Sequence, residues 1–223
     1  MSRLEIDVFG ASETRLQWDL LSHSQSLSKQ MGLREGAKCQ TSHNIHERFG
    51  KNQQGGTCMI ANEEVAQYVT TQGADEEGLG RWSWMRLAGA GAATRIITAY
   101  IPCVTRKKAI SATIAQQKRY WRLQGEYQCS RKLLRRDLIA KMLEWREDGD
   151  KLILILDGNE DMKNGQLARM LRHPDLDMKD AVKSRSNIDG PATFVRGSRQ
   201  IDGAWVTPDI EISAACFLPF FLE

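Results

Sequence analysis

The sequence predicts an α+β fold whose strands pair mainly in an antiparallel manner. Apolar and β-branched segments intermix with segments of helical periodicity, but they do not form strict strand–helix–strand repeats. The strand-like segments 82–87 and 95–101 follow one another with no helical segment between them, which favours antiparallel neighbours over a doubly wound parallel sheet. An unbroken apolar run at 152–156 has the composition of a strand buried on both faces.

The overall composition is that of a globular protein. Of 223 residues, 41% are hydrophobic and 26% are charged, which excludes wholesale disorder. The net charge of +3 is too small to indicate a polyanionic partner by itself. No apolar stretch is long enough to span a membrane, and the amino-terminal segment has no signal-peptide core. The five cysteines include no CxxC spacing, so we expect an intracellular protein, nuclear or cytoplasmic, without a disulfide framework.

Six segments are predicted as strands from their apolar and β-branched composition. The third alternates with period two, as a half-buried strand does, and the fourth ends where Pro102 removes a backbone donor. The sixth is interrupted by Pro208, after which we expect a further short strand at 210–212. In chain order the six segments are 6–12, 57–60, 82–87, 95–101, 152–156 and 204–207.

The longest predicted helix covers 130–148. Its apolar residues recur at i, i+4, i+8 and i+11, and Ser130 is a suitable N-cap. Arginines and lysines occupy the other face, which we expect to be solvated rather than to bind phosphate. Shorter helices are predicted at 112–123 and 165–172, and the polar stretch 22–54 is expected to hold one short helix and a long surface loop.

The most informative segment for chemistry follows the apolar strand 152–156. This strand runs directly into Asp157-Gly158-Asn159, and the two polar side chains alternate around the glycine so that both can point to one side. A carboxylate beside an amide suits a general base with an orienting hydrogen-bond donor, or a site for a hard cation. The competing interpretation is a polar turn in which Asp and Asn are favoured for backbone reasons.

Three further residues are candidates because each stands at the edge of a predicted strand. Glu13 follows the first strand and is either a metal-binding carboxylate or an acid that stabilises a helix start. Tyr100, held before Pro102, either contacts a phosphate oxygen or belongs to the core. Asp202, before Gly203, is either a partner for an arginine or a metal, or an ordinary β-turn residue.

A histidine pair is the other pattern that a metal can use. His43 and His46 have a suitable spacing for a helix, but the sequence offers no third ligand near them. We therefore interpret them as a surface pair.

Several short motifs occur in an order that is shared with one known superfamily. They are Ser12-Glu13-Thr14, Gly55-Gly56-Thr57, Thr98-Ala99-Tyr100-Ile101-Pro102, Leu156-Asp157-Gly158-Asn159, Thr193-Phe194 and Arg199-Gln200-Ile201-Asp202. With these motifs the chain resembles the endonuclease/exonuclease/phosphatase superfamily, which is DNase I-like. Segments such as RWSWMRL and GDKLILILDGNED are most similar to retrotransposon and reverse-transcriptase-associated endonuclease domains. The motifs span almost the whole chain, so we expect a single domain over 1–223.

The resemblance implies a four-layer α/β/β/α sandwich, with two sheets face to face and helices outside. It also implies a hydrolase that cleaves phosphodiester bonds of nucleic acid, DNA in particular, with Mg²⁺ or Mn²⁺ and without an organic cofactor or a membrane. By the same resemblance Glu13 binds the metal, and Asp157 orients or deprotonates the attacking water. Asn159 holds that water and the phosphate, Tyr100 contacts the phosphate, and Asp202 orients a catalytic histidine. We expect these side chains to converge on one cleft with Tyr100 at its rim.

The chain departs from the superfamily pattern at three places. It lacks the first strand with its asparagine and the final Asp-His pair, so we expect a domain that is incomplete at both ends, and Cys103 replaces the usual polar residue after Tyr-x-Pro. Because the last histidine is His173, no residue fills the family's histidine role, and we expect impaired nuclease activity. The alternatives are a non-catalytic homologue that at most binds nucleic acid, and a phosphatase that acts on small phosphorylated substrates.

Overall fold

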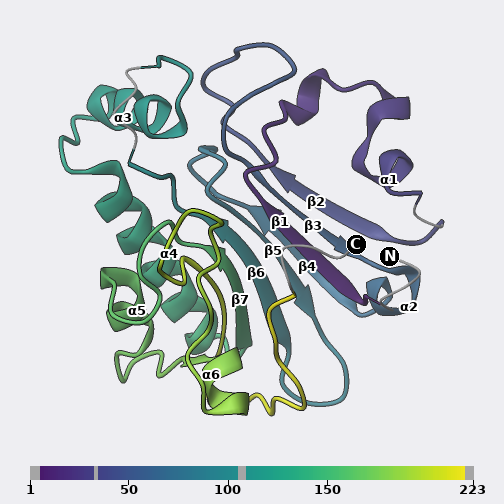
Figure 1. Ribbon diagram of the computed structural model, residues 1–223. Helices are drawn as coiled ribbons and strands as arrows, with labels where there is room; N and C mark the ends of the chain where they lie inside the picture. The colour runs from purple at the N-terminus through teal and green to yellow at the C-terminus, as the bar shows by residue number, and fades with distance from the viewer. Residues whose placement is uncertain (1–5, 33–34, 105–108, 219–223) are drawn as a thin grey trace.

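Two β-sheets packed face to face form the centre of the computed structural model, which describes residues 6–32, 35–104 and 109–218 (Figure 1). Its strands are β1 (Val8–Ser12), β2 (Lys38–Ser42), β3 (Thr57–Ala61), β4 (Val69–Ala74), β5 (Trp82–Leu87), β6 (Thr94–Tyr100), β7 (Lys151–Asp157), β8 (Lys179–Asp180) and β9 (Asp202–Val206). The larger sheet has the order β4-β5-β6-β7-β9-β8, and the smaller has the order β1-β3-β2. The α+β class predicted from the sequence is thereby confirmed.

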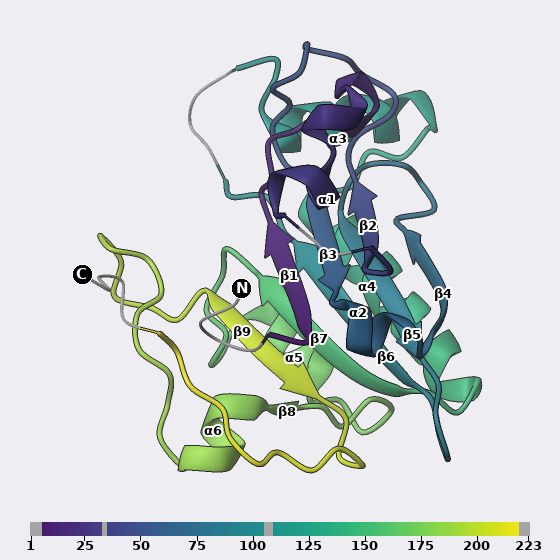
Figure 2. The same ribbon diagram turned by 90° about the vertical axis from the view of Figure 1, so that its right-hand side faces the viewer.

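Helices flank this pair of sheets. They are α1 (Leu27–Gln30), α2 (Glu63–Ala66), α3 (Thr113–Leu123), α4 (Ser130–Glu147), α5 (Gln166–Leu171) and α6 (Ala181–Ser186). Helices α4 and α5 lie on the face of the larger sheet that points away from the smaller sheet, whereas the short α1 and α2 lie beside the smaller sheet (Figures 1 and 2). Among the described helices, none has both the length and the apolar character needed to cross a bilayer.

The predicted strands occur close to their expected bounds, and their pairing is antiparallel with one exception. Strands β6 and β7 are parallel, with Ile97 opposite Leu154. Parallel neighbours need a long crossover, and here α3 and α4 provide it. The larger sheet is therefore mixed rather than wholly antiparallel.

Strand β7 is buried more completely on one face than on the other. Leu152, Leu154 and Leu156 are buried in the main core with residues of α4 such as Leu138 and Trp145. The alternate residues Ile153 and Ile155 are only half-buried, because β1, the edge strand of the smaller sheet, is what lies over β7. The expectation of burial on both faces was therefore wrong for the face that looks toward the smaller sheet.

Several sequence predictions failed where polar residues form regular structure. The stretch 22–54 contains the short helix α1 but also β2, which pairs with β3 through a polar sequence, and the polar edge strand β4 was not predicted. No strand forms at 210–212, because the chain turns there and the Ile210 N–H bonds to the Thr207 carbonyl at 3.1 Å. The N-cap of α4 is Cys129, which makes no side-chain capping bond, and Ser130 is the first helical residue.

The basic face of α4 also differs from its prediction. Arg136 is exposed as expected, but Arg131 and Arg135 are 8% and 7% exposed. Both side chains lie against the segment that follows β7, where they find hydrogen-bond acceptors. Burial of a guanidinium group requires such partners, so these two arginines belong to the interior of the fold.

Candidate active site

Three of the candidate residues form one row across the larger sheet. Tyr100 ends β6 and lies opposite Asp157, which ends β7, and Asp157 in turn lies opposite Asp202, which begins β9. Residues opposite one another in a sheet point to the same face. The register of three strands therefore gathers a phenol and two carboxylates that are distant in sequence.

Glu13 is delivered to the same edge by the segment after β1. Glu13 and Arg15 have φ values of 54° and 58°, and the N–H of Arg15 bonds to the Gly55 carbonyl at 2.9 Å. A Cβ on Gly56 would lie 2.7 Å from the Thr14 hydroxyl oxygen, so a glycine permits this close approach. The Glu13 carboxylate accepts a 2.9 Å hydrogen bond from Arg15 Nη2.

These side chains border two adjacent cavities rather than one cleft. Asp157 and Asp202 line a cavity of about 250 Å³, together with residues of β1, β6 and the segment near 216–217. Glu13 and Tyr100 line a second cavity of about 270 Å³, which is also lined by the beginning of α3. Asn159 lines neither cavity.

The two facing aspartates strongly influence each other. Burial, the negative charge of Asp202 and, to a smaller extent, that of Glu13 together raise the pKa of Asp157 to about 7. Burial also raises the pKa of Asp202, although hydrogen bonds from Thr193 and Asp157 act against it. Such a pair retains a proton near neutral pH, so Asp157 can act either as a general acid or as a general base.

Tyr100 stays protonated beside these acids. It is 3% exposed, and burial together with the charges of Glu13 and Asp157 raises the pKa of its hydroxyl. A neutral phenol next to carboxylates is a hydrogen-bond donor that suits an anionic oxygen better than it suits proton abstraction.

Asn159 is held by backbone interactions. It has a φ of 44°, and its N–H bonds to Asp157 Oδ1 at 3.3 Å, a contact that lowers the pKa of Asp157. Its side-chain Nδ2 donates to the Ile101 carbonyl at 2.9 Å. Within the described residues, the second N–H of this amide and its oxygen make no other hydrogen bond, so both can bind a ligand.

Thr193 gives the Thr-Phe motif a physical role that the sequence did not reveal. Its Oγ1 accepts hydrogen bonds from the N–H groups of Ile201 at 2.9 Å and Asp202 at 3.0 Å. These bonds fix the beginning of β9 and therefore the position of the Asp202 carboxylate. Arg131 was missed as well, because its acceptors are carbonyls of two loops that lie far from it in sequence.

The oxygen donors of this edge fit a hard divalent cation. Glu13 offers carboxylate oxygens, and its charge is near enough to raise the pKa of Asp157, an effect that a cation would offset. Across residues 6–32, 35–104 and 109–218, no group of three or more His, Cys, Asp or Glu side chains converges to hold a metal. A bound Mg²⁺ would take its remaining ligands from water or substrate, as this ion commonly does.

The histidines lie elsewhere in the molecule. His43 is 9% exposed and its Nε2 is 3.2 Å from Asp19 Oδ2, so the expected surface pair with His46 is wrong for His43. His46 and His173 are exposed. Of the histidines whose side chains the structure describes, none lines either cavity.

Solved structures with the same fold include proteins from several branches of life. The catalytic domain of human Nocturnin with bound sulfate has a TM-score of 0.57 at 13% identity, covering 91% of this chain and 69% of that one. The 3′ phosphatase NExo from Neisseria, bound to a product DNA hairpin, has a TM-score of 0.58 at 15% identity, covering 93% and 78%. An endonuclease/exonuclease/phosphatase from Bacteroides vulgatus has a TM-score of 0.54 at 16% identity, covering 93% and 75%.

These similarities establish a DNase I-like fold for the chain. No protein-family model matches the sequence, and no curated protein matches it. The fold agrees with the superfamily resemblance carried by the sequence motifs, whereas the comparisons carry no information on similarity to retrotransposon proteins in particular.

Proposed function

We propose that this protein hydrolyses phosphodiester bonds of nucleic acid at the edge formed by β6, β7 and β9. The observation that carries the proposal is the row Tyr100, Asp157 and Asp202, in which the pKa of Asp157 is raised to about 7. A base with a pKa near the working pH combines a useful basic fraction with useful driving force for proton transfer. Carboxylates with a purely structural role rarely have a pKa raised this far, so the row is a candidate functional site.

In the proposed mechanism Asp157 accepts a proton from the attacking water. Asp202 shares a hydrogen bond with Asp157 and keeps its carboxyl group oriented. Tyr100 donates a hydrogen bond from its hydroxyl group to a phosphate oxygen, and the amide group of Asn159 holds the water or the phosphate. Asp202 has no described histidine beside it to orient, so its assigned partner in this chain is Asp157.

We assign the metal-binding role to Glu13, with Mg²⁺ or Mn²⁺ as the ion. When bound, the ion would neutralise charge that develops on the phosphate. The carboxylate of Glu13 is partly exposed and lies at the wall of the second cavity, where a phosphate has access to it. The same carboxylate accepts the hydrogen bond from Arg15 Nη2 at 2.9 Å.

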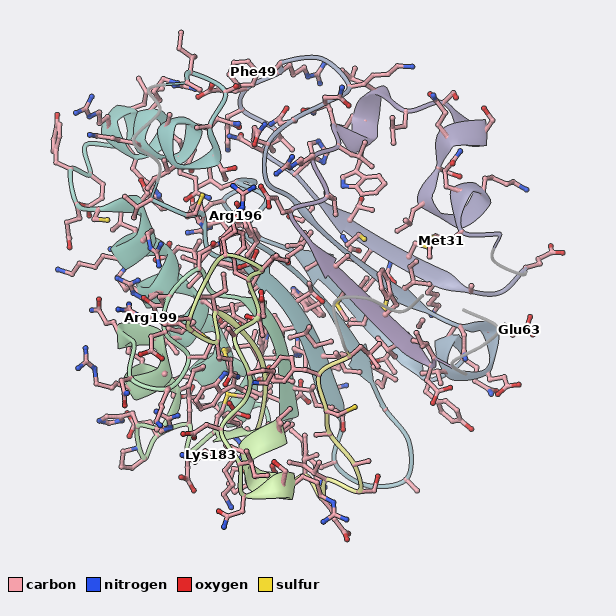
Figure 3. The ribbon with its side chains drawn as sticks, viewed as in Figure 1. Met31, Phe49, Glu63, Lys183, Arg196 and Arg199 are labelled. Atoms are coloured by element: carbon pink, nitrogen blue, oxygen red, sulfur yellow. The ribbon has the colours of Figure 1, made fainter. Side chains whose placement is uncertain are left out.

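Nucleic acid is the favoured substrate, and DNA in particular. NExo is described with a product DNA hairpin, and another solved structure with the same fold is an AP endonuclease from Archaeoglobus fulgidus. Arg196 and Arg199 are exposed on the loop that precedes β9, beside the strand that carries Asp202 (Figure 3). Exposed arginines next to a candidate active site supply positive charge for a phosphate backbone.

The finer parts of the proposal rest on the sequence motifs. We propose a retroelement-derived endonuclease domain formed by residues 1–223 and located inside the cell, in the nucleus or the cytoplasm. Activity is expected to be weak, because no described histidine reaches the cavities to assist the leaving group. A phosphatase that acts on small phosphorylated substrates is the second candidate, supported by the 3′ phosphatase activity named for NExo.

The proposal is tested by nicking of supercoiled plasmid DNA and of an abasic oligonucleotide with Mg²⁺. The wild-type protein should nick slowly and the Asp157→Ala variant should not. Asp161→Asn is a matched control, since Asp161 lies in the same loop but its carboxylate bonds to the N–H of Lys163 at 2.8 Å. This control should retain wild-type activity.

The same proteins distinguish the alternatives. Phosphate release from a small phosphomonoester without nicking would favour the phosphatase. Binding of DNA that is equal in wild type and Asp157→Ala, with no nicking by either, would contradict the catalytic proposal and favour a non-catalytic homologue.

A further inference from the structure

Arg131 lies behind the two loops that carry the candidate site residues. It is the second residue of α4, and its side chain is 9% exposed. Its guanidinium donates to the carbonyls of Pro102 at 3.2 Å, Gly158 at 3.3 Å and Asn159 at 3.1 Å. One side chain therefore joins the loop after β6 to the loop after β7.

The position of Arg131 in the first turn of α4 does not account for its burial. A cation in the first turn opposes the helix dipole, whose positive end lies there. Its ion-pair contact within the described part of the chain is a 3.5 Å approach to Glu160, which is long for a buried pair. Since burial of an arginine is unfavourable without good acceptors, the three carbonyls are what hold Arg131 in place.

The geometry of the peptide unit explains what these bonds achieve. The carbonyl of Gly158 and the N–H of Asn159 belong to one planar trans peptide and point in opposite directions. Arg131 holds the oxygen of this unit, and its N–H faces Asp157 Oδ1 at 3.3 Å. A bond on the carbonyl of Asn159 also restrains the left-handed backbone of that residue.

We propose that Arg131 is a positioning residue that fixes the Gly158–Asn159 peptide against Asp157 and ties this loop to the end of β6. The inference deepens the proposed function and rests on it for its catalytic consequence. Arg131 does not touch the substrate in this account, because its guanidinium faces the backbone of the loops. It acts through the orientation of Asp157 and Asn159.

Arg135 offers a matched control from the same helix. It lies about one turn after Arg131, and its side chain is also 9% exposed. Its guanidinium donates to Glu160 at 3.1 Å and Gln166 at 2.7 Å, which are side chains near the beginning of α5. Loss of Arg135 removes an equally buried charge without releasing the peptide beside Asp157.

The test compares Arg131→Met, Arg131→Lys and Arg135→Met with the wild-type chain. The pKa of Asp157 is followed by ¹³C NMR, kcat and KM by Mg²⁺-dependent nicking, and Tm by calorimetry. Glu13 and Asp202, the groups whose charges raise the pKa of Asp157, are unchanged in all variants.

Arg131→Met should raise the pKa of Asp157, because the N–H of Asn159 lowers it in the wild type. It should lower kcat on the order of 10- to 100-fold with little change in KM. Arg131→Lys should restore part of both properties, and it replaces the methionine variant if that variant does not fold. Arg135→Met should lower Tm without moving the pKa or kcat.

Equal shifts of the Asp157 titration in Arg131→Met and Arg135→Met, or no shift in either, would overturn the proposal. An inactive wild type would count against the proposed function, and the NMR titration would still decide the role of Arg131.

Discussion

The aspartates at the two ends of β7 have opposite electrostatic surroundings. Asp150, just before the strand, is fully buried and accepts hydrogen bonds from Arg86 at 2.9 Å and from Arg95 at 2.7 Å. Asp157, at the other end, faces the carboxylate of Asp202, and its pKa is raised to about 7. The charge of Asp150 is balanced by two arginines, whereas Asp157 faces another negative charge.

This difference separates a structural acid from a functional one. Arg95 is itself enclosed by aromatic rings, 4.4 Å from the Trp84 centroid and 4.5 Å from that of Trp145, so the Asp150 end is part of the core. Two facing carboxylates weaken the fold when both are ionised. An acid pair that lines a cavity and costs stability when ionised is a candidate for function rather than for structure.

The largest effect expected is on catalysis. Asp157→Asn should lower the nicking rate by about 10²- to 10⁴-fold, because an amide cannot accept the proton that the carboxylate removes. Single-turnover assays with protein in excess over plasmid measure this change. A variant with more than half of the wild-type rate would remove Asp157 from the mechanism.

The opposite end of the strand should respond in stability. Asp150→Asn should lower the free energy of unfolding by about 3 to 5 kcal/mol, because it leaves two arginines without their buried partner. Urea denaturation monitored by tryptophan fluorescence measures the change. A loss below that of an ordinary surface substitution would mean that the cluster of Asp150, Arg86 and Arg95 contributes little to the fold.

At the Asp157 end, the same type of substitution should stabilise the protein, and the effect should depend on pH. The folded-state pKa of Asp157 is raised above that of the unfolded chain, so its favourable contribution is complete below about pH 4 and is lost as pH rises through about 7. Asp157→Asn should therefore gain about 2 to 4 kcal/mol over wild type at pH 8 and nothing near pH 4. Denaturation curves at both values test this, and a gain that is independent of pH would refute the raised pKa.

The smallest effect concerns the partner acid. Asp202→Asn removes one negative charge that opposes ionisation of Asp157, so the pKa of Asp157 should fall below 7 while remaining raised by burial. Site-specific ¹³C titration measures the shift. An unchanged value would indicate that Asp202 does not contribute to the raised pKa of Asp157.

The sequence predicted those elements whose apolar pattern is local. The apolar core strands and α4 were found because their periodicity is local, as in Leu134, Leu138 and Met142. The edge strands β2 and β4 were missed because polar residues fill them, and edges need no apolar pattern. Such a strand forms because it hydrogen-bonds to a neighbouring strand, and that neighbour cannot be identified from the sequence of the strand itself.

The candidate site was predictable in its members but not in its arrangement. Short motifs pointed to Asp157, Asp202 and Tyr100, but their alignment in one row depends on the register of three strands. Arg131 looked like a solvated residue because its acceptors are backbone carbonyls, which are the same in every sequence. The burial of Arg131 and the raised pKa of Asp157 depend on contacts between residues distant in sequence, so only the structure reveals them.

The most direct test of the central claim is the pH dependence of the nicking rate with Mg²⁺ between pH 5 and 9. If Asp157 is the base, kcat/KM should rise with pH as this carboxyl ionises and level off above about pH 7, and Asp202→Asn should move the midpoint to lower pH. A rate that does not change with pH through this range, or that Asp157→Asn leaves intact, would contradict the account.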